Sequence, residues 1–300
     1  MSSVVRVFAV VALMTFPSFA GAQGVDTVWV RQYTNLDDYY GNVEEAVVDS
    51  AGNLYLAGYI GEFGIADLIT VKFRSNGDTA WVRRYDGTAH VKDVAKGIAV
   101  DAEGNVYVSG FSRDTAWFTD IVVTIKYDSA GDIVWLRTFH NELWEGGDDV
   151  AEVIAVDSAG NVIVAGRSGV GEMSVYLTLK YDGDGDSLWV DMYGASGGDD
   201  VINALTVDHD GNIYVSGNSA GFGTGMDYAT IKYAPDGERL WIRRYDGPDN
   251  GDDLVWGPGA IGVDDSGNVY VTGISYGGGA GTDCATIKYR SDGVTDWVSR

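Results

Sequence analysis

The pattern Asp-x-x-Gly-Asn recurs five times along the chain, each time followed by a short apolar segment and a glycine. The copies begin at Asp49, Asp101, Asp157, Asp208 and Asp264, at intervals of 52, 56, 51 and 56 residues. Tryptophans keep the same spacing, at Trp29, Trp81, Trp135, Trp189, Trp241 and Trp297. A period of this kind indicates one supersecondary unit copied along the chain, and it constrains the fold more than composition does.

One copy of the unit, residues 93–139, predicts four short strands. Apolar and β-branched segments at 94–100, 106–110, 121–127 and 133–139 are separated by turn residues rich in Gly, Asn and Asp. The connections leave no room for a helix, so each copy is expected to form an antiparallel meander. In the fifth copy we place the first strand at Ile261–Asp264.

Repeats of four strands are typical of β-propellers, in which blades stack and bury both faces of each sheet. We therefore predict an all-β fold, a β-propeller of four-stranded antiparallel blades with five complete blades. Thr27–Tyr33 forms an extra N-terminal outer strand, and the repeat pattern stops at Arg300 partway through its motif. This favours a sequence truncated from a larger ring, with residues 23–300 as one repeat domain.

Residues 1–22 have the pattern of a secretory signal peptide. Arg6 precedes the apolar segment 7–16, and Ala20-Gly21-Ala22 fits a small-x-small cleavage site. We expect cleavage after Ala22 and a secreted, periplasmic or cell-surface protein. No other segment has the length and apolarity of a membrane span.

The net charge of −24 disfavours nucleic acid and anionic membranes as partners. The single cysteine, Cys284, excludes an intrachain disulfide. It falls in the third strand of the fifth copy near the position of Ala229, so we expect a small buried residue.

Four aspartates precede the first strands in nearly equal register. Asp93, Asp149 and Asp200 each lie eight residues before their turn aspartate, and Asp253 lies eleven before Asp264. Since the first strand of a propeller blade is innermost, these residues could form an acidic ring at one mouth of the central channel, able to hold calcium or a water cluster. Aspartates that only form turns on a solvated rim are the simpler interpretation.

The segment Asp182-Gly183-Asp184-Gly185-Asp186 has the first three ligand spacings of a calcium loop. Its twelfth position is Tyr193 rather than the bidentate Glu that such loops use, so a strand turn explains it better. Apart from calcium at such sites, the sequence predicts no cofactor.

The loops between second and third strands vary most between copies and are the expected contact surface. They carry the aromatic residues Trp117, Phe118, Phe222 and Tyr276, which are suited to anchor an extracellular protein or a glycan.

No His-Glu-x-x-His motif and no Ser/His/Asp set in a plausible context occurs in the chain. Every recurrent polar residue has a structural role available, so we expect no catalytic residue and a binding or scaffolding module. The alternative is a propeller enzyme, either a quinoprotein-like dehydrogenase or a glycan hydrolase or lyase.

The segments Asp101–Gly110, Ile125–Tyr127 and Gly131–Trp135 together resemble the SBBP family of bacterial β-propeller repeats. The resemblance covers essentially all of residues 23–300. It implies an exported or surface-attached bacterial protein, often with further domains, and it implies no shared enzymatic activity. A weaker likeness to the tryptophan-docking repeats of quinoprotein dehydrogenases lacks their cofactor residues.

Overall fold

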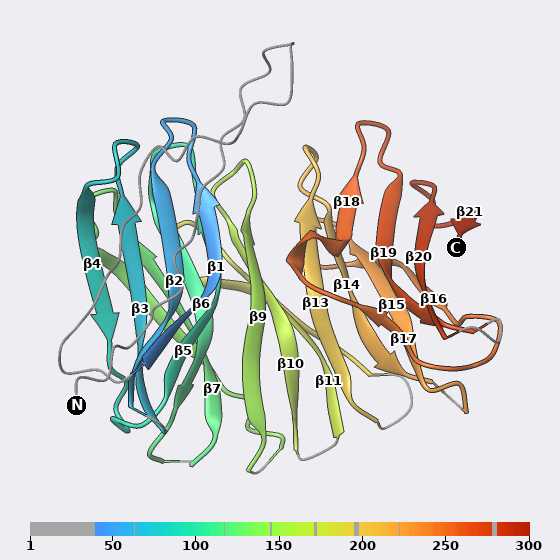
Figure 1. Ribbon diagram of the computed structural model, residues 1–300, viewed down its shortest axis with the longest axis horizontal. Helices are drawn as coiled ribbons and strands as arrows, with labels where there is room; N and C mark the ends of the chain where they lie inside the picture. Colours follow the sequence, from blue (N-terminus) through green and yellow to red (C-terminus); the bar gives the residue numbers. More distant parts are fainter. Residues whose placement is uncertain are drawn as a thin grey trace.

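The computed structural model describes residues 40–62, 64–116, 118–144, 146–170, 173–194, 198–221, 223–277 and 281–300. These residues form five consecutive antiparallel sheets, each built from one copy of the repeat, as predicted for propeller blades (Figure 1). The predicted signal peptide and the strand at Thr27–Tyr33 lie outside the described residues. In the described part of the chain, no helix is long and apolar enough to cross a membrane.

The strands follow the repeat in chain order. Blade 1 is β1 Tyr40–Val48, β2 Leu54–Glu62, β3 Ile65–Phe73 and β4 Thr79–Tyr85. Blade 2 is β5 Asp93–Val100, β6 Val106–Arg113, β7 Asp120–Tyr127 and β8 Ile133–Phe139. Blade 3 is β9 Asp148–Val156, β10 Val162–Val170, β11 Met173–Tyr181 and β12 Ser187–Tyr193. Blade 4 is β13 Asp200–Val207, β14 Ile213–Ala220, β15 Met226–Tyr233 and β16 Arg239–Tyr245. Blade 5 is β17 Asp253–Val255, β18 Ile261–Val263, β19 Val269–Tyr276, β20 Thr282–Tyr289 and β21 Thr295–Ser299.

The Asp-x-x-Gly-Asn motif closes the turn between the first and second strands of every blade. In blade 2, Asp101 Oδ1 accepts a hydrogen bond from the Asn105 backbone N–H at 2.8 Å. Its Oδ2 accepts from Asn105 Nδ2 at 2.8 Å and from the Tyr107 hydroxyl at 2.9 Å. Gly104 has φ 81°, a conformation that favours glycine. The other four aspartates accept the same bonds from their asparagines. The motif is therefore structural, as its recurrence predicts.

The repeated tryptophans dock each blade onto the next one. The Trp135 indole N–H donates to the Gly183 carbonyl of blade 3 at 3.1 Å, and its ring packs on Gly185. A Cβ at Gly185 would lie 2.8 Å from Trp135 Cδ2, which explains why the motif requires glycine. Trp81, Trp189 and Trp241 make the same contact with Gly131, Gly237 and Gly293. The hydrophobic cores accordingly lie between blades, each containing residues from two of them.

The first strands are innermost, because β1, β5, β9 and β13 contact one another in succession. In blade 5 this strand is divided, which corrects the expected single strand at Ile261–Asp264. β17 pairs with β19 at Asp253–Val255, a 3-10 turn follows at Pro258–Ala260, and β18 resumes the pairing at Ile261. Pro258 has no N–H for a ladder bond and Gly257 has φ 87°, so the backbone leaves the sheet here.

Cys284 is exposed, so the prediction that it is a small buried residue is wrong. It pairs with Ile274 within blade 5, and no described blade packs on the far side of that sheet. The equivalent position in blade 4 is Tyr228, which is fully buried because its hydroxyl and ring pack on blade 5. A thiol at the end of the stack therefore loses the cover that internal blades provide.

Candidate functional site

An irregularity in each first strand directs one side chain out of the regular pairing. The shift in register falls at Glu44 in β1, Lys96 in β5, Glu152 in β9 and Asn203 in β13. Each of these residues lies five positions before the turn aspartate of its blade. A β-bulge leaves its extra residue unpaired and re-aims the side chain. The same position in blade 5 falls within the divided strand.

The four bulge residues line one cavity of about 430 Å³. Residues 254–258 of blade 5 complete its wall, so the first strands of all five blades contribute to it. A second cavity of about 940 Å³ lies toward the Asp-x-x-Gly-Asn turns and shares Glu45, Val153 and Pro258 with the first. The two cavities therefore form one axial channel, and we call the smaller one the axial cavity.

Carboxylates dominate one side of the axial cavity. Lys96 Nζ forms an ion pair with Glu44 Oε2 at 3.0 Å. Glu45 Oε2 accepts a hydrogen bond from the Ile98 backbone N–H at 2.7 Å, while burial raises the pKa of this carboxyl. Burial also raises the pKa of Glu152, although the charge of Lys96 opposes that shift. The cavity thus holds three glutamates and one lysine in partly desolvated surroundings.

Amides and an aromatic ring form the opposite side. Asn203 Nδ2 donates to the Val255 carbonyl at 3.1 Å, and Asn218 Oδ1 accepts from the Val255 N–H at 2.7 Å. These bonds hold the end of β17, from which Trp256 projects. Trp256 lines the axial cavity yet is 75% exposed. A large aromatic side chain in solvent beside polar groups is a feature of ligand sites.

The structure places the predicted acidic residues between blades. Asp93, Asp149, Asp200 and Asp253 are buried, and each accepts a hydrogen bond from a backbone N–H, of Gly87, Asn141, Ala220 and Gly247 respectively. Among the described residues that line the two axial cavities, none of the four is present. Each pairs with the end of a second strand, and in blades 2 to 4 the aspartate lies three residues before the bulge that faces the axis.

The segment at 182–186 forms the turn between β11 and β12. Asp182 Oδ1 accepts hydrogen bonds from the backbone N–H groups of Asp184 at 3.0 Å and Asp186 at 2.8 Å. The first carboxylate is thus occupied by the turn itself, as in the Asp-x-x-Gly-Asn turns.

The predicted contact loops present two of their four aromatic residues in the described chain. Phe118 is 80% exposed in the β6–β7 loop, and Tyr276 is 46% exposed at the end of β19. Trp117 and Phe222 lie outside the described residues. Leu143, in the loop after β8, is a further exposed apolar residue at the same end of the blades. This surface stays a candidate for a macromolecular partner.

Sequence reasoning missed the axial cavity, although a pattern pointing to it was present. The position five residues before the turn aspartate reads Glu, Lys, Glu, Asn and Gly in the five copies. Neighbouring positions are apolar in most copies, so this variation in charge marks a surface that packing does not constrain. Only the bulges show that these side chains converge.

Comparison with known proteins supports the repeat and the fold. Residues 188–223 match the family model of the SBBP beta-propeller repeat, which confirms the resemblance seen in the sequence. An uncharacterized WD repeat-containing protein, L264 of Acanthamoeba polyphaga mimivirus, is 27% identical over 155 residues. That match covers 46% of this chain and only 10% of the viral protein.

Solved propeller-like structures resemble the chain at low identity. A polysaccharide lyase, Uly1, superposes with a TM-score of 0.51 at 10% identity, covering 89% of this chain and 74% of its own. A protein of unknown function from Dyadobacter fermentans gives a TM-score of 0.48 at 10% identity, covering 87% and 81%. A gluconolactonase from Xanthomonas campestris gives 0.41 at 16% identity, covering 84% and 86%. At such identities the likeness concerns the fold alone.

Proposed function

We propose that this protein is a binding module that takes a small polar ligand in the axial cavity. The observation that carries the proposal is the contrast between copies at the bulge position. Residues that hold the fold recur in every blade, whereas the bulge position carries three residue types, as Glu44, Lys96, Glu152 and Asn203, whose side chains meet in one cavity. Residues that stabilise the fold are expected to be the same in every copy. Residues that contact one ligand with chemically different sides are expected to differ between copies.

The lining restricts the ligand's chemistry. Three glutamates against one lysine make the wall negative, so it disfavours anionic ligands. Carboxylates and amides suit hydroxyl or amine groups, and the exposed face of Trp256 suits a sugar ring or an organic cation. The cavity volume of about 430 Å³ falls in the range of small-molecule sites.

The test is a binding screen of the whole chain against neutral oligosaccharides and against primary and quaternary amines, by isothermal titration calorimetry. We expect Trp256→Ala and Glu152→Gln each to weaken a binder from the screen, with unchanged thermal stability. Phe118→Ala is the matched control, because it removes another exposed aromatic side chain far from the axial cavity. If Phe118→Ala weakened binding and Trp256→Ala left the affinity unchanged, the ligand site would lie on the loops and not in the axial cavity.

The enzyme alternative has one observation in its favour. Burial raises the pKa of Glu45 and of Glu152, and a carboxyl with a raised pKa is a feature of general acids. A glycan hydrolase or lyase would then turn over a member of the oligosaccharide panel. Glu152→Gln would abolish turnover but retain binding, which distinguishes this function from simple recognition.

Export is part of the same proposal. The signal-like pattern of residues 1–22 and the strongly acidic composition support a protein that acts outside the cytoplasm. N-terminal sequencing of the protein recovered from its native cell fraction should begin at Gln23. A cytoplasmic protein that retains Met1 would contradict it.

A further inference from the structure

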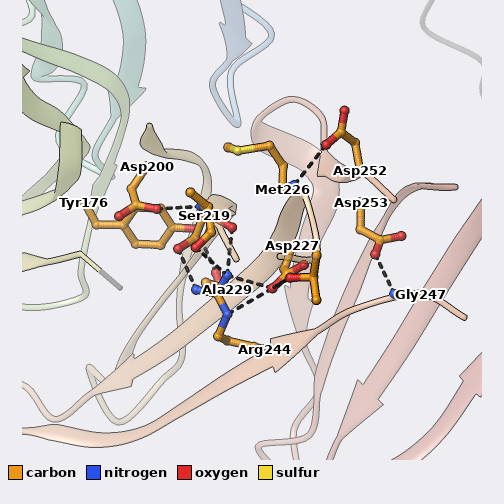
Figure 2. A network of polar contacts seen from close by, with 12 residues as sticks. Tyr176, Asp200, Ser219, Met226, Asp227, Ala229, Arg244, Gly247, Asp252 and Asp253 are labelled. Atoms are coloured by element: carbon orange, nitrogen blue, oxygen red, sulfur yellow. Dashed lines mark hydrogen bonds and ion pairs between the residues drawn. The ribbon is translucent and has the colours of Figure 1, made fainter. Parts of the chain in front are cut away.

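Three carboxylates meet at the interface between blades 4 and 5, and none of them lines the axial cavity. Asp227 lies on β15, Asp246 follows β16 and Asp253 begins β17. One oxygen from each lies within 4.8 Å of the other two. Figure 2 shows Asp227 and Asp253 in this region, with Arg244 below them and Gly247 on the chain that leads to β17.

Protein donors satisfy only half of the two buried carboxylates. Asp227 Oδ2 accepts from Arg244 Nη2 at 2.8 Å and from its Nε at 3.2 Å. Asp253 Oδ2 accepts from the Gly247 N–H at 2.5 Å. The Oδ1 atoms of both residues are buried and have no hydrogen-bond donor among the described residues. Since Asp227 and Asp253 are 4% and 0% exposed, these oxygens have lost water without gaining a partner.

The charges at this interface do not balance. Arg244 is held by Ser219 and compensates one of the three carboxylates. Two negative charges remain. Burial, and then the charges of Asp227 and Asp253, raise the pKa of Asp246. A divalent cation would compensate both charges and supply the partner that the two Oδ1 atoms lack.

The interface between blades 1 and 2 repeats the arrangement. Asp67, Asp86 and Asp93 occupy the equivalent positions, again with one oxygen each within 4.8 Å of the others. Arg84 Nε contacts Asp67 Oδ2 at 2.7 Å, as Arg244 contacts Asp227. The arginine and the three aspartates thus occur together at two interfaces.

The other two interfaces have different side chains at these positions. Between blades 2 and 3, His140 replaces the exposed aspartate, and its Nδ1 lies 2.9 Å from Asp149 Oδ2. Between blades 3 and 4, Gly194 stands at that position, and the Ser174 hydroxyl donates a hydrogen bond to the Asp200 backbone carbonyl at 2.8 Å. Among the described residues, three carboxylates therefore approach one another this closely only between blades 1 and 2 and between blades 4 and 5.

We propose that the Asp227–Asp246–Asp253 cluster, and its copy Asp67–Asp86–Asp93, are each a calcium site that joins two blades. Calcium takes carboxylate oxygens in flexible geometry and completes its shell with water, which suits a cluster with one exposed member. Magnesium requires a stricter octahedral arrangement and sheds its water reluctantly, so it should bind more weakly. This proposal is independent of the axial ligand.

The experiment is calorimetric titration of the chelator-treated chain with calcium chloride at physiological salt, with a thermal melt in parallel. We expect two saturable sites and a higher melting temperature with calcium. Asp246→Asn should leave one site and Asp86→Asn likewise. The double variant should show neither saturable binding nor a calcium-dependent rise. Asp86 and Asp246 are exposed, so these substitutions should not prevent folding.

Asp265→Asn is the matched control, since it removes the same charge from an exposed turn in blade 5. It should keep both sites. Equal loss of calcium binding in the Asp265→Asn variant would mean diffuse counter-ion binding to an acidic surface, and would overturn the proposal. An unchanged stoichiometry in Asp246→Asn, or no saturable binding to the wild-type chain, would overturn it as well.

Discussion

Two positions five residues apart, one within the first strand and one directly after it, vary differently between the blades. The aspartate directly after the strand is the same in all five blades and makes the same bonds to the asparagine four residues on. The bulge residue is acidic in blades 1 and 3, basic in blade 2 and neutral in blade 4, and it faces the axial cavity. One position is fixed by the local turn, whereas the other is free of the turn and of the sheet ladder.

This difference separates scaffold from site within a single strand. A substitution at the repeated position should affect folding, and one at the variable position should affect only what the axial cavity holds.

Trp135→Ala should have the largest effect. The indole is 5% exposed, packs between blades 2 and 3 and donates to the Gly183 carbonyl. Loss of a buried tryptophan should lower the unfolding free energy by about 3–5 kcal/mol, measured by urea denaturation. Trp297→Ala is the control within the same motif, because Trp297 is 41% exposed and should cost about 1 kcal/mol or less. Equal losses would mean that docking between blades is not what the motif provides.

Asp208→Ala should have an intermediate effect. It removes the acceptor of the Asn212 backbone bond at 2.9 Å, of the Asn212 side chain at 2.8 Å and of the Tyr214 hydroxyl at 2.8 Å. We expect a loss of about 1–3 kcal/mol in the same denaturation experiment. Asp210→Ala, in the same turn but exposed, should change the value by about 0.5 kcal/mol or less. A similar loss in both variants would contradict the special role of the first aspartate.

Two groups of carboxyls should make stability depend on pH in opposite directions. Hydrogen bonds from the Asn268 side chain and backbone lower the pKa of Asp264 to about 2. Equivalent bonds also lower the pKa values of Asp49, Asp157 and Asp208. Their contribution is complete above the unfolded pKa of about 3.9 and is lost as pH falls toward about 2.

Burial raises the pKa of Glu45 and Glu152, so the sign is opposite for these residues. The folded state binds more protons, and stability rises as pH falls toward the unfolded glutamate pKa of about 4.3. Thermal melts across this range should therefore show a maximum near pH 4. A monotonic decline from neutral pH would show that the axial glutamates do not contribute.

Glu152→Gln should have the smallest effect on folding. It removes a desolvated charge from the axial cavity without changing the shape of the side chain, so the unfolding free energy at neutral pH should change by about 0.5 kcal/mol or less, or increase slightly. The gain in stability as the pH falls from neutral should become smaller at the same time. A large destabilisation would place Glu152 with the scaffold and remove the contrast on which the proposed function depends.

Much of the fold could be predicted from local patterns in the sequence. The strand predicted at 133–139 has the bounds that the structure shows, because a turn with a required glycine precedes it. The divided first strand of blade 5 was missed. Pro258 and Gly257 oppose a continuous strand there, but only the pairing of both halves with β19 shows that Asp253–Val255 belongs to the same sheet.

The sequence by itself determined the repeat, the four strands of each blade and the structural role of every turn aspartate, since these depend on residues within one copy. Tertiary structure alone decided which polar residues meet. Asp227 and Asp253 come together because blade 5 packs on blade 4, and Glu44 meets Lys96 because first strands share one axis. The exposure of Cys284 has the same origin, because burial in a stack depends on the neighbouring blade and not on the residue's own strand.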